Sequence, residues 1–304
     1  MQVLAPGLSY VDLMHQGLPR IIASALVQSA GGIALIDPGP ASCLPVLERA
    51  LEARGLTLAD LTAILVTHIH LDHSGATGSI LRLNPRVTVY VHEQGAPHLV
   101  APEKLVASAT RLWGAAMQTL WGEVLPVPTS AIRTLAGGEQ IDVAGRRFDV
   151  AYTPGHASHH VSYLNRDTGV AFVGDTAGVC LSPGGYVVPP TPPPDIDLEL
   201  WRRSLATIAA WRPDTLFMTH FGPTGPVAAH LATLEQQLDL AARLVRESLA
   251  REGDDAAREA WFGEALVRDL CRSMSEADAA AYNAAGQFEL GWRGLARYYR
   301  KRPA

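Results

Sequence analysis

The sequence predicts an α/β fold followed by a helical tail, and three observations support this prediction. Short apolar runs alternate with helically spaced apolar residues as far as about residue 226, as in strands interleaved with helices. Hydrophobic residues make up 48% of the 304 residues and charged residues 18%, which allows a large buried core. Beyond residue 226 the pattern is helical alone. We therefore expect one domain over 1–226 and a helical extension over 227–304.

The first hundred residues show alternating strand and helix signals. Gly31-Gly32 separates two apolar runs, as a hairpin turn would. Gly55 is suited to end one helix, and Asn84-Pro85 to end the next. The expected elements are strands at 21–27 and 33–36, a helix at 44–54, a strand at 63–67, a helix at 74–83 and a strand at 87–91.

Residues 97–122 predict a helical insertion. Its leucines, Met117 and two tryptophans, Trp113 and Trp121, recur at roughly helical spacing. These side chains either pack on the core or form the wall of a substrate pocket, because insertions near a site often line it. We keep both possibilities, with Trp113 and Met117 as candidate substrate contacts.

Strand signals return over residues 140–173, and a Pro-rich loop follows. Prolines 192–194 make this loop extended and stiff. Tyr186 on the loop either donates a hydrogen bond to a substrate oxygen or packs on its neighbours. A helix at 198–211 and a strand at 215–218 complete the domain.

The helical extension begins with a long apolar stripe after Pro226. We expect two further helices, the last of them starting at Ser275-x-x-Asp278, which resembles a capping box. The extension packs on its own core or forms a homodimer contact.

Charge and composition disfavour several classes of partner. The net charge of −5 provides no basic face for nucleic acid, and no apolar run approaches the length of about 20 residues that crosses a membrane. Cys43, Cys180 and Cys271 are odd in number and far apart, so they predict neither a disulfide framework nor a zinc ribbon. The N-terminus shows no signal-peptide pattern. We expect a cytoplasmic protein acting on a small molecule.

The stretch THIHLDHSG at 67–75 concentrates four ligand-type side chains after a buried strand. His68 and His70 share one face of the strand, and Asp72 and His73 follow where a helix begins. Four such groups at one place need a neutralising cation, because unpaired buried polar groups are costly. Imidazole and carboxylate ligands suit Zn²⁺, Fe²⁺ or Mn²⁺.

Three further candidates lie downstream, each after an apolar strand. They are His156 in PGH, Asp175 in VGD and His220 in TH. Asp37, at the end of another strand, either orients a ligand histidine or is a turn residue before Pro38. His159 and His160 follow His156 closely, and one of them is a candidate brace for the site.

In this order, HxHxDH, PGH, GD and TH resemble the metallo-β-lactamase superfamily over about residues 8–226. The segments IDPGP, THFGP and GYVVPPTPPPD resemble a branch of hydrolase-like members. The resemblance implies a four-layer αββα sandwich with two metal ions, Zn²⁺ first and Fe²⁺ or Mn²⁺ as alternatives, in the groove between the sheets. It also implies the ligand sets: His68, His70 and His156 at site one, Asp72, His73 and His220 at site two, and Asp175 as the bridge.

The resemblance further implies catalysis by a metal-bridging hydroxide that attacks a polarised carbonyl. Asp175 and Asp72 would be the catalytic carboxylates, with Asp72 holding the ion that stabilises the leaving oxygen or sulfur.

Departures from the family patterns narrow the choice. Zinc β-lactamases usually carry Cys where Asp175 stands, and homoserine lactonases typically carry Tyr where Gly178 stands. Glutathione thioesterases use basic residues after the bridging Asp, but no Lys or Arg occurs between Asp175 and Arg202. We expect a hydrolase of a carboxylic ester, lactone or thioester with an apolar acyl group. The alternatives are a mononuclear-iron persulfide dioxygenase, a phosphodiesterase or a non-catalytic binding module.

Overall fold

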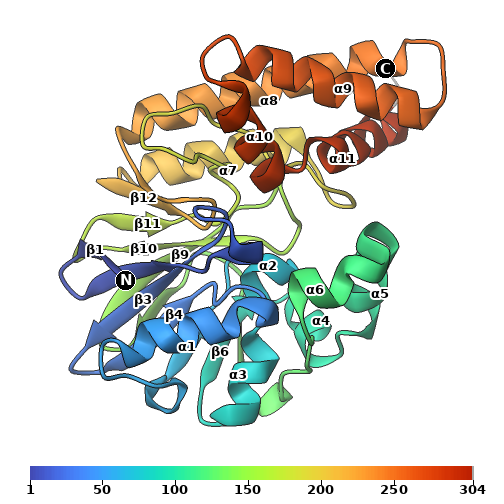
Figure 1. Cartoon of the computed structure of the whole chain (residues 1–304). Helices are drawn as coiled ribbons and strands as arrows, with labels where there is room; N and C mark the ends of the chain where they lie inside the picture. The colour runs from blue at the N-terminus through green and yellow to red at the C-terminus, as the bar shows by residue number, and fades with distance from the viewer. Residues whose placement is uncertain (303–304) are drawn as a thin grey trace.

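The computed structural model describes residues 1–302, with two β-sheets packed face to face at its centre (Figure 1). The first sheet has the strands in sequence order. Its first four strands are antiparallel, and the pairs from β4 to β7 are parallel. The strands are β1 (Gln2–Ala5), β2 (Leu8–Asp12), β3 (Ala23–Ser29), β4 (Gly32–Ile36), β5 (Ala63–Leu65), β6 (Thr88–His92) and β7 (Ile132–Leu135).

The second sheet has the order β13-β12-β11-β10-β9-β8. In this sheet β11 pairs with β12 in parallel, and the other neighbouring pairs are antiparallel. The strands are β8 (Gln140–Val143), β9 (Arg146–Tyr152), β10 (Val161–Asn165), β11 (Val170–Phe172), β12 (Thr215–Met218) and β13 (Gly222–Thr224).

Helices cover the outer face of each sheet. In Figure 1, α1 (Leu44–Glu52) and α3 (Thr77–Leu83) lie below the first sheet, and α7 (Leu198–Ala210) and α8 (Val227–Leu249) lie above the second. The order helix, sheet, sheet, helix confirms the predicted four-layer αββα fold.

Strand alternation explains why two layers of core form. In β4, Ala34 and Ile36 belong to the buried cluster between the sheets, which also contains Phe172 and Phe217 of the second sheet. The neighbouring Leu35 belongs to the cluster under the helices. Since successive strand side chains point to opposite faces, a central strand that is apolar throughout fills both layers.

The predicted insertion forms short helices beside the sheet edge. After α2 (Leu71–Ser74) and β6 come α4 (Ala96–Val100), α5 (Glu103–Trp113) and α6 (Met117–Trp121). Figure 1 shows α5 at the side of the molecule, below α11.

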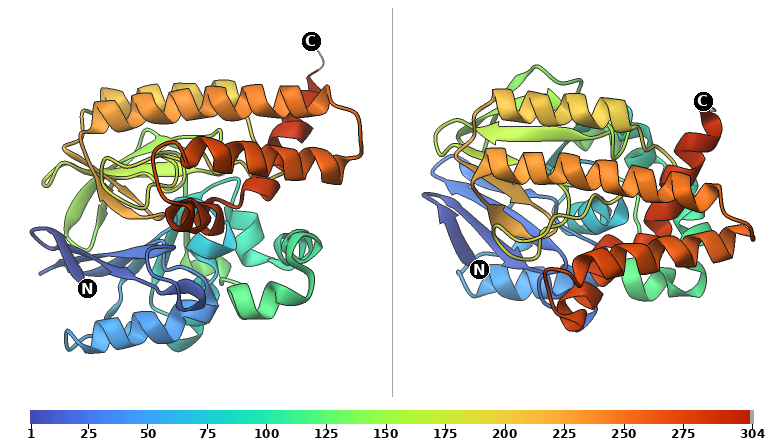
Figure 2. Two further views of the ribbon diagram at one scale, coloured as in Figure 1. Left: turned by 45° about the horizontal axis from the view of Figure 1, so that its top comes forward. Right: turned by 90° about the horizontal axis from the view of Figure 1, so that it is seen from above.

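The extension contains one helix more than predicted. After α8 come α9 (Asp255–Leu270), α10 (Glu276–Gly286) and α11 (Phe288–Lys301), as Figure 2 shows from two further sides. The prediction of a single helix from Ser275 onward was wrong because Gln287 adopts a left-handed conformation, φ 49°, which ends α10 and redirects the chain. Side chains of α8–α11 join the buried cluster over the second sheet, so the division at residue 226 stays a proposal.

No helix within residues 1–302 is both long enough and apolar enough to span a membrane.

Candidate metal centre

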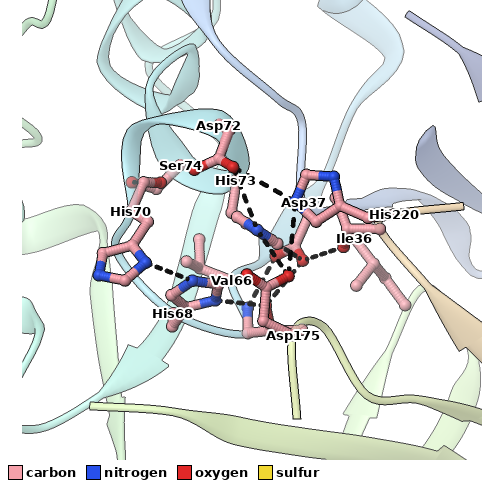
Figure 3. A network of polar contacts seen from close by, with 12 residues as sticks. Ile36, Asp37, Val66, His68, His70, Asp72, His73, Ser74, Asp175 and His220 are labelled. Carbon is pink, nitrogen blue, oxygen red and sulfur yellow. Dashed lines mark hydrogen bonds and ion pairs between the residues drawn. The ribbon is translucent and has the colours of Figure 1, made fainter. Parts of the chain in front are cut away.

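The structure brings the seven predicted ligand residues together at one edge of the two sheets. His68 and His70 follow β5, and Asp72 and His73 lie in the first turn of α2. The remaining three residues follow β9, β11 and β12 in the second sheet: His156, Asp175 and His220. Because β11 runs parallel to β12, the residues after these two strands emerge at the same edge. Figure 3 shows most of this cluster from close by.

Three histidines form the first group. His68 Nε2 lies 2.9 Å from His70 Nδ1, and His156 Nε2 lies 3.2 and 3.0 Å from these two atoms. The second ring nitrogen of His156 donates to Pro190 O at 2.8 Å, and that of His68 lies 3.2 Å from Thr67 Oγ1. The outward bond of His156 leaves its Nε2 unprotonated and facing the ring nitrogens of His68 and His70, a crowding of nitrogens that a cation would relieve.

The second group combines a carboxylate with two histidines. His73 Nδ1 donates to Asp37 Oδ2 at 2.8 Å, and His220 Nδ1 donates to Ile21 O at 2.6 Å. The Nε2 atoms of the two rings are 3.8 and 3.3 Å from Asp72 Oδ2. Each ring is therefore anchored on one side and presents Nε2 to the centre.

Asp175 lies between the two groups. Its Oδ2 is 3.3 Å from His156 Nε2, and its Oδ1 is 3.2 Å from His73 Nε2 and 3.5 Å from His220 Nε2. Within residues 1–302, the buried atoms Asp175 Oδ1 and His73 Nε2 form no hydrogen bond, although they lie 3.2 Å apart. Buried polar atoms are rarely left so, and a bound ion is one standard explanation.

The first group is kept in the neutral, ligand form. Burial and the neighbouring His156 lower the pKa of His70 to about 4. Burial, followed by the neighbouring imidazoles, also lowers the pKa of His68, and burial lowers that of His156. Neutral imidazole is the form that coordinates a metal ion.

The second group is dominated by negative charge. Burial opposes ionisation of Asp72 and Asp175, but the nearby histidines, His73 foremost, outweigh it and lower the pKa of both carboxyls. In turn, the carboxylates raise the pKa of His73 and His220 despite burial. The centre therefore attracts positive charge, and a divalent ion would displace the ring protons.

This donor set fits two divalent ions. The ligand atoms within each group lie within 4.8 Å of one another. Ring nitrogens at about 2.0 Å from a single tetrahedral zinc would be about 3.3 Å apart, close to the separations in the first group. Asp175 is placed to contact both positions.

Asp37 connects the two sheets behind the ligands. Besides His73, its carboxylate accepts bonds from Thr67 N and Oγ1 at 2.8 and 2.7 Å and from Thr219 Oγ1 at 2.8 Å. The sequence prediction overlooked both threonines, although each directly precedes a ligand histidine. This repeated Thr-His pair after a strand could have revealed them.

The two histidines after His156 have different environments. His160 is fully buried, its Nε2 accepts from Asp175 N at 3.3 Å, and its Nδ1 lies 3.0 Å from Thr153 Oγ1. His159 Nδ1 accepts from Ile69 N at 3.4 Å, and its ring borders the cavity described next. His160 thus supports the backbone of Asp175.

A cavity of about 340 Å³ opens from the centre between α5, the Pro-rich loop and the α10–α11 junction. Trp113 lines this cavity and Met117 does not, and a substrate contact by Trp113 stays a prediction. Leu105 and Leu112 of the predicted insertion also line it, together with residues that sequence reasoning did not single out, among them Gln94, Lys104 and Leu290.

Tyr186 is placed away from this cavity, contrary to the expectation of a substrate contact. Its hydroxyl lies 2.6 Å from Gln237 Oε1 and 2.7 Å from Asp269 Oδ2, on α8 and α9. Burial and Asp269 raise the pKa of this phenol above its ordinary value. The Pro-rich loop passes beneath the C-terminal helices, so this side chain fastens the loop to them.

Two stacked sheets, covering helices and a histidine–aspartate centre at the sheet edge define the metallo-β-lactamase-fold class of metalloproteins. A sequence model described as the metallo-beta-lactamase superfamily matches residues 17–220. The chain belongs to this superfamily, as its motifs predicted. Members bind divalent metal ions, and the clustered ligands agree with this property.

The chain is similar to several known sequences and solved structures. ST1585 of Sulfurisphaera tokodaii, a metallo-beta-lactamase fold-containing protein, is 31% identical over 56% of this chain. That match spans 64% of ST1585, less than two thirds of its length. A hydroxyacylglutathione hydrolase of Chromohalobacter salexigens is 31% identical over 76% of this chain and 67% of its own. The structure of TTHA1429 from Thermus thermophilus shares the fold, with a TM-score of 0.74 at 23% identity over 99% of this chain and 96% of its own.

Proposed function

We propose that this chain is a metal-dependent hydrolase that cleaves a carboxylic ester, lactone or thioester. One observation carries the proposal: seven imidazole and carboxylate groups converge, with His73 Nε2 and Asp175 Oδ1 buried and without a hydrogen bond among the described residues. The family and the hydroxyacylglutathione hydrolase relatives support a hydrolase of this class.

Two zinc ions would be held by the groups described above. His68, His70 and His156 would bind one ion, Asp72, His73 and His220 the other, and Asp175 both. When bound, such ions supply Lewis acidity and lower the pKa of water, so that a nucleophile exists at neutral pH without a separate base.

The protein's own contribution is to fix the ligands and the substrate. Outward hydrogen bonds from His156, His73 and His220 hold each ring in one tautomer, with its second nitrogen presented to the centre. Asp37 accepts hydrogen bonds from His73 and from Thr67 and Thr219, the residues directly before His68 and His220. It therefore holds the two ligand segments at a fixed separation. The apolar cavity wall excludes water from the acyl group and orients the carbonyl toward the ligands.

The cavity supports an apolar acyl group rather than a highly charged substrate. Leu71, Leu105, Leu112 and Trp113 line it, and Lys104 is its one basic side chain besides the histidines among the described lining residues. Glutathione carries two carboxylates, for which this wall offers few partners. We therefore place the substrate among neutral acyl esters and thioesters.

Metal analysis and a substrate panel test the proposal together. Protein purified without chelator should contain two zinc ions per chain and hydrolyse neutral acyl thioesters, aryl esters or lactones. Removal of metal should abolish turnover, and zinc should restore it. Activity confined to phosphodiesters would contradict the proposal.

The donor set favours one alternative, an iron enzyme of the persulfide dioxygenase kind, because imidazole and carboxylate also suit Fe²⁺. Such an enzyme needs one iron and consumes oxygen. The complete second ligand group is compatible with either enzyme, so metal analysis decides between them. One iron per chain with persulfide-dependent oxygen uptake would establish the alternative.

The compartment and the assembly remain part of the proposal. Cys43, Cys180 and Cys271 are free thiols, which suits a reducing compartment such as the cytoplasm. The helical extension is the proposed homodimer contact. Cell fractionation and light scattering of the purified protein test these two points.

A further inference from the structure

A second cavity also borders the metal centre. It has a volume of about 260 Å³ and lies between the segment that follows β2, α6 and α10. Asp72 and His220 border both cavities, whereas His70, His156 and Asp175 border only the larger one. The ligand cluster is therefore the place where the two cavities meet.

Aromatic side chains also lie along the common border of the two cavities. Trp113 and Trp121 line both, and their rings pack edge to face at 5.5 Å between centroids. Trp121 also stacks on His15, with centroids 5.4 Å apart. Gln287, at the α10–α11 junction, borders both cavities from the other side. A substrate that extends into both spaces can therefore place its carbonyl beside Asp72 and His220, which border both.

The two walls differ in chemistry. Leucines and the proline run dominate the larger cavity, which suits an alkyl or aryl group. The smaller cavity presents amides and an imidazole, from Gln16, Asn283, Gln287 and His15, beside aliphatic side chains. Among the described residues that line the smaller cavity, there is no lysine or arginine, and Asp72 is the one carboxylate. This wall offers hydrogen bonds but no counter-ion for an anionic group.

We propose that the substrate is an open-chain ester or thioester with two arms, an apolar acyl arm in the larger cavity and an uncharged polar leaving group in the smaller one. This inference rests on the proposed function. Water adds its oxygen to the carbonyl carbon, the bond from that carbon to the leaving oxygen or sulfur breaks, and the leaving atom takes a proton. The carboxylic acid remains in the larger cavity and the alcohol or thiol in the smaller one.

Steric filling of each cavity separately tests this assignment. Ala109 of α5 lines only the larger cavity, and Ala284 of α10 only the smaller one. The substitutions Ala109→Trp and Ala284→Trp add the same side chain to a helix surface. The probes are octanoyl and acetyl thioesters of N-acetylcysteamine, which is uncharged and carries an amide, and of methanethiol, which is small.

Each substitution should change one selectivity ratio. Ala109→Trp should lower the octanoyl-to-acetyl ratio of kcat/KM about tenfold, because a few methylenes change discrimination by about that factor. Ala284→Trp should instead lower the N-acetylcysteamine-to-methanethiol ratio. Ala232→Trp, on the exposed side of α8, is the matched control and should leave both ratios unchanged.

Binding provides a readout independent of turnover. Ketone analogues, in which a methylene replaces the sulfur, should bind the metal-free protein with the same pattern of loss in calorimetry. Glutathione thioesters should be hydrolysed more slowly than N-acetylcysteamine thioesters of the same acyl group.

The outcomes distinguish failure of the two-arm assignment from failure of the proposed hydrolase function. Hydrolysis in which both substitutions lower the same ratio, or in which neither ratio responds, would overturn the two-arm assignment and leave the proposed hydrolase intact. Absence of hydrolysis of every carbonyl substrate would overturn both. Ketone binding that responds to the two substitutions in the expected pattern would support the assignment.

Discussion

Asp37 shows how one carboxylate supports the centre without being a ligand. It accepts hydrogen bonds from His73, Thr67 and Thr219. In Asp37→Asn, the amide can offer His73 Nδ1 a donor, which favours the tautomer with a proton on Nε2, the atom that faces the centre. We expect about 10- to 100-fold weaker metal binding at site two, measured by competition with a chromogenic chelator.

An exposed carboxylate provides the control for this substitution. Asp167 lies on the turn between β10 and β11 and is exposed, so Asp167→Asn should bind metal as the native protein does. Equal metal affinity in Asp37→Asn, with a matching thermal midpoint, would mean that Asp37 is only a turn residue.

His230 predicts a pH dependence of stability outside the metal centre. It is buried on α8, and its Nε2 donates to Ala177 O at 2.8 Å. Burial lowers its pKa below the ordinary value of about 6.5, although the bond to Ala177 opposes this shift. Below about pH 6.5 the unfolded chain therefore binds more protons than the folded one, and the free energy of unfolding falls as pH falls.

His230→Gln isolates this contribution, because glutamine can also donate to the carbonyl but does not titrate. The advantage in unfolding free energy of the native protein over the variant should shrink from pH 7.5 to pH 5.5, by at most about 1.4 kcal/mol per pH unit. Urea titrations of both metal-loaded proteins measure it, and the other histidines cancel in the difference. A constant difference would show that His230 keeps its ordinary pKa.

At the scale of single residues, sequence reasoning located the ligand-type side chains but not the residues that surround them. His156, Asp175 and His220 each follow an apolar strand, and strand ends meet at a sheet edge, so their convergence was predictable. The position of Tyr186 was not predictable, because a loop residue can face either side. Its neighbours Gln237 and Asp269 come from helices far along the chain.

The start of α10 gives a prediction at the scale of one element. Ser275 Oγ accepts from Asp278 N at 3.2 Å and caps this helix, which carries one wall of the smaller cavity. Ser275→Ala should lower the free energy of unfolding by about 1 kcal/mol, the usual value of such a cap. Urea unfolding of the whole protein measures the change.

Thr233→Ala is a matched control, for which no fall in the free energy of unfolding is expected. Thr233 lies inside α8, and its hydroxyl bonds to Ala229 O within the same helix. Thr233→Ala also removes a hydroxyl but raises helix propensity, so it should be neutral or slightly stabilising. Equal destabilisation by both substitutions would argue against the capping role of Ser275.

Elements with a strong local pattern were predicted well, and those set by tertiary contacts were not. The strand at 215–218 has the predicted bounds. The strand β2 was not expected, because its first four residues are all buried and the sequence therefore lacks the alternation of a half-exposed strand. The break at Gln287 was missed because left-handed backbone is uncommon outside glycine, and propensity alone continues the helix.

For the whole molecule, the cores and the metal centre make different demands on folding. The cluster between the sheets and the cluster under the helices are apolar and are complete without an ion. The centre, by contrast, gathers buried imidazoles and carboxylates that repel or remain unpaired. The metal-free protein should therefore fold but be less stable than the metal-bound one.

Metal removal tests this separation. A ligand that binds only the folded state stabilises it by about 2.7 kcal/mol at a free concentration 100 times its dissociation constant. Chelation should lower the thermal midpoint by several degrees while the far-ultraviolet circular dichroism at about room temperature stays unchanged, and zinc should restore the midpoint. An unchanged midpoint would mean that the seven groups tolerate one another without a cation, and the proposed function would lose its physical basis. Loss of the secondary structure itself would show that the cores depend on the ions, contrary to the independence inferred from their apolar composition.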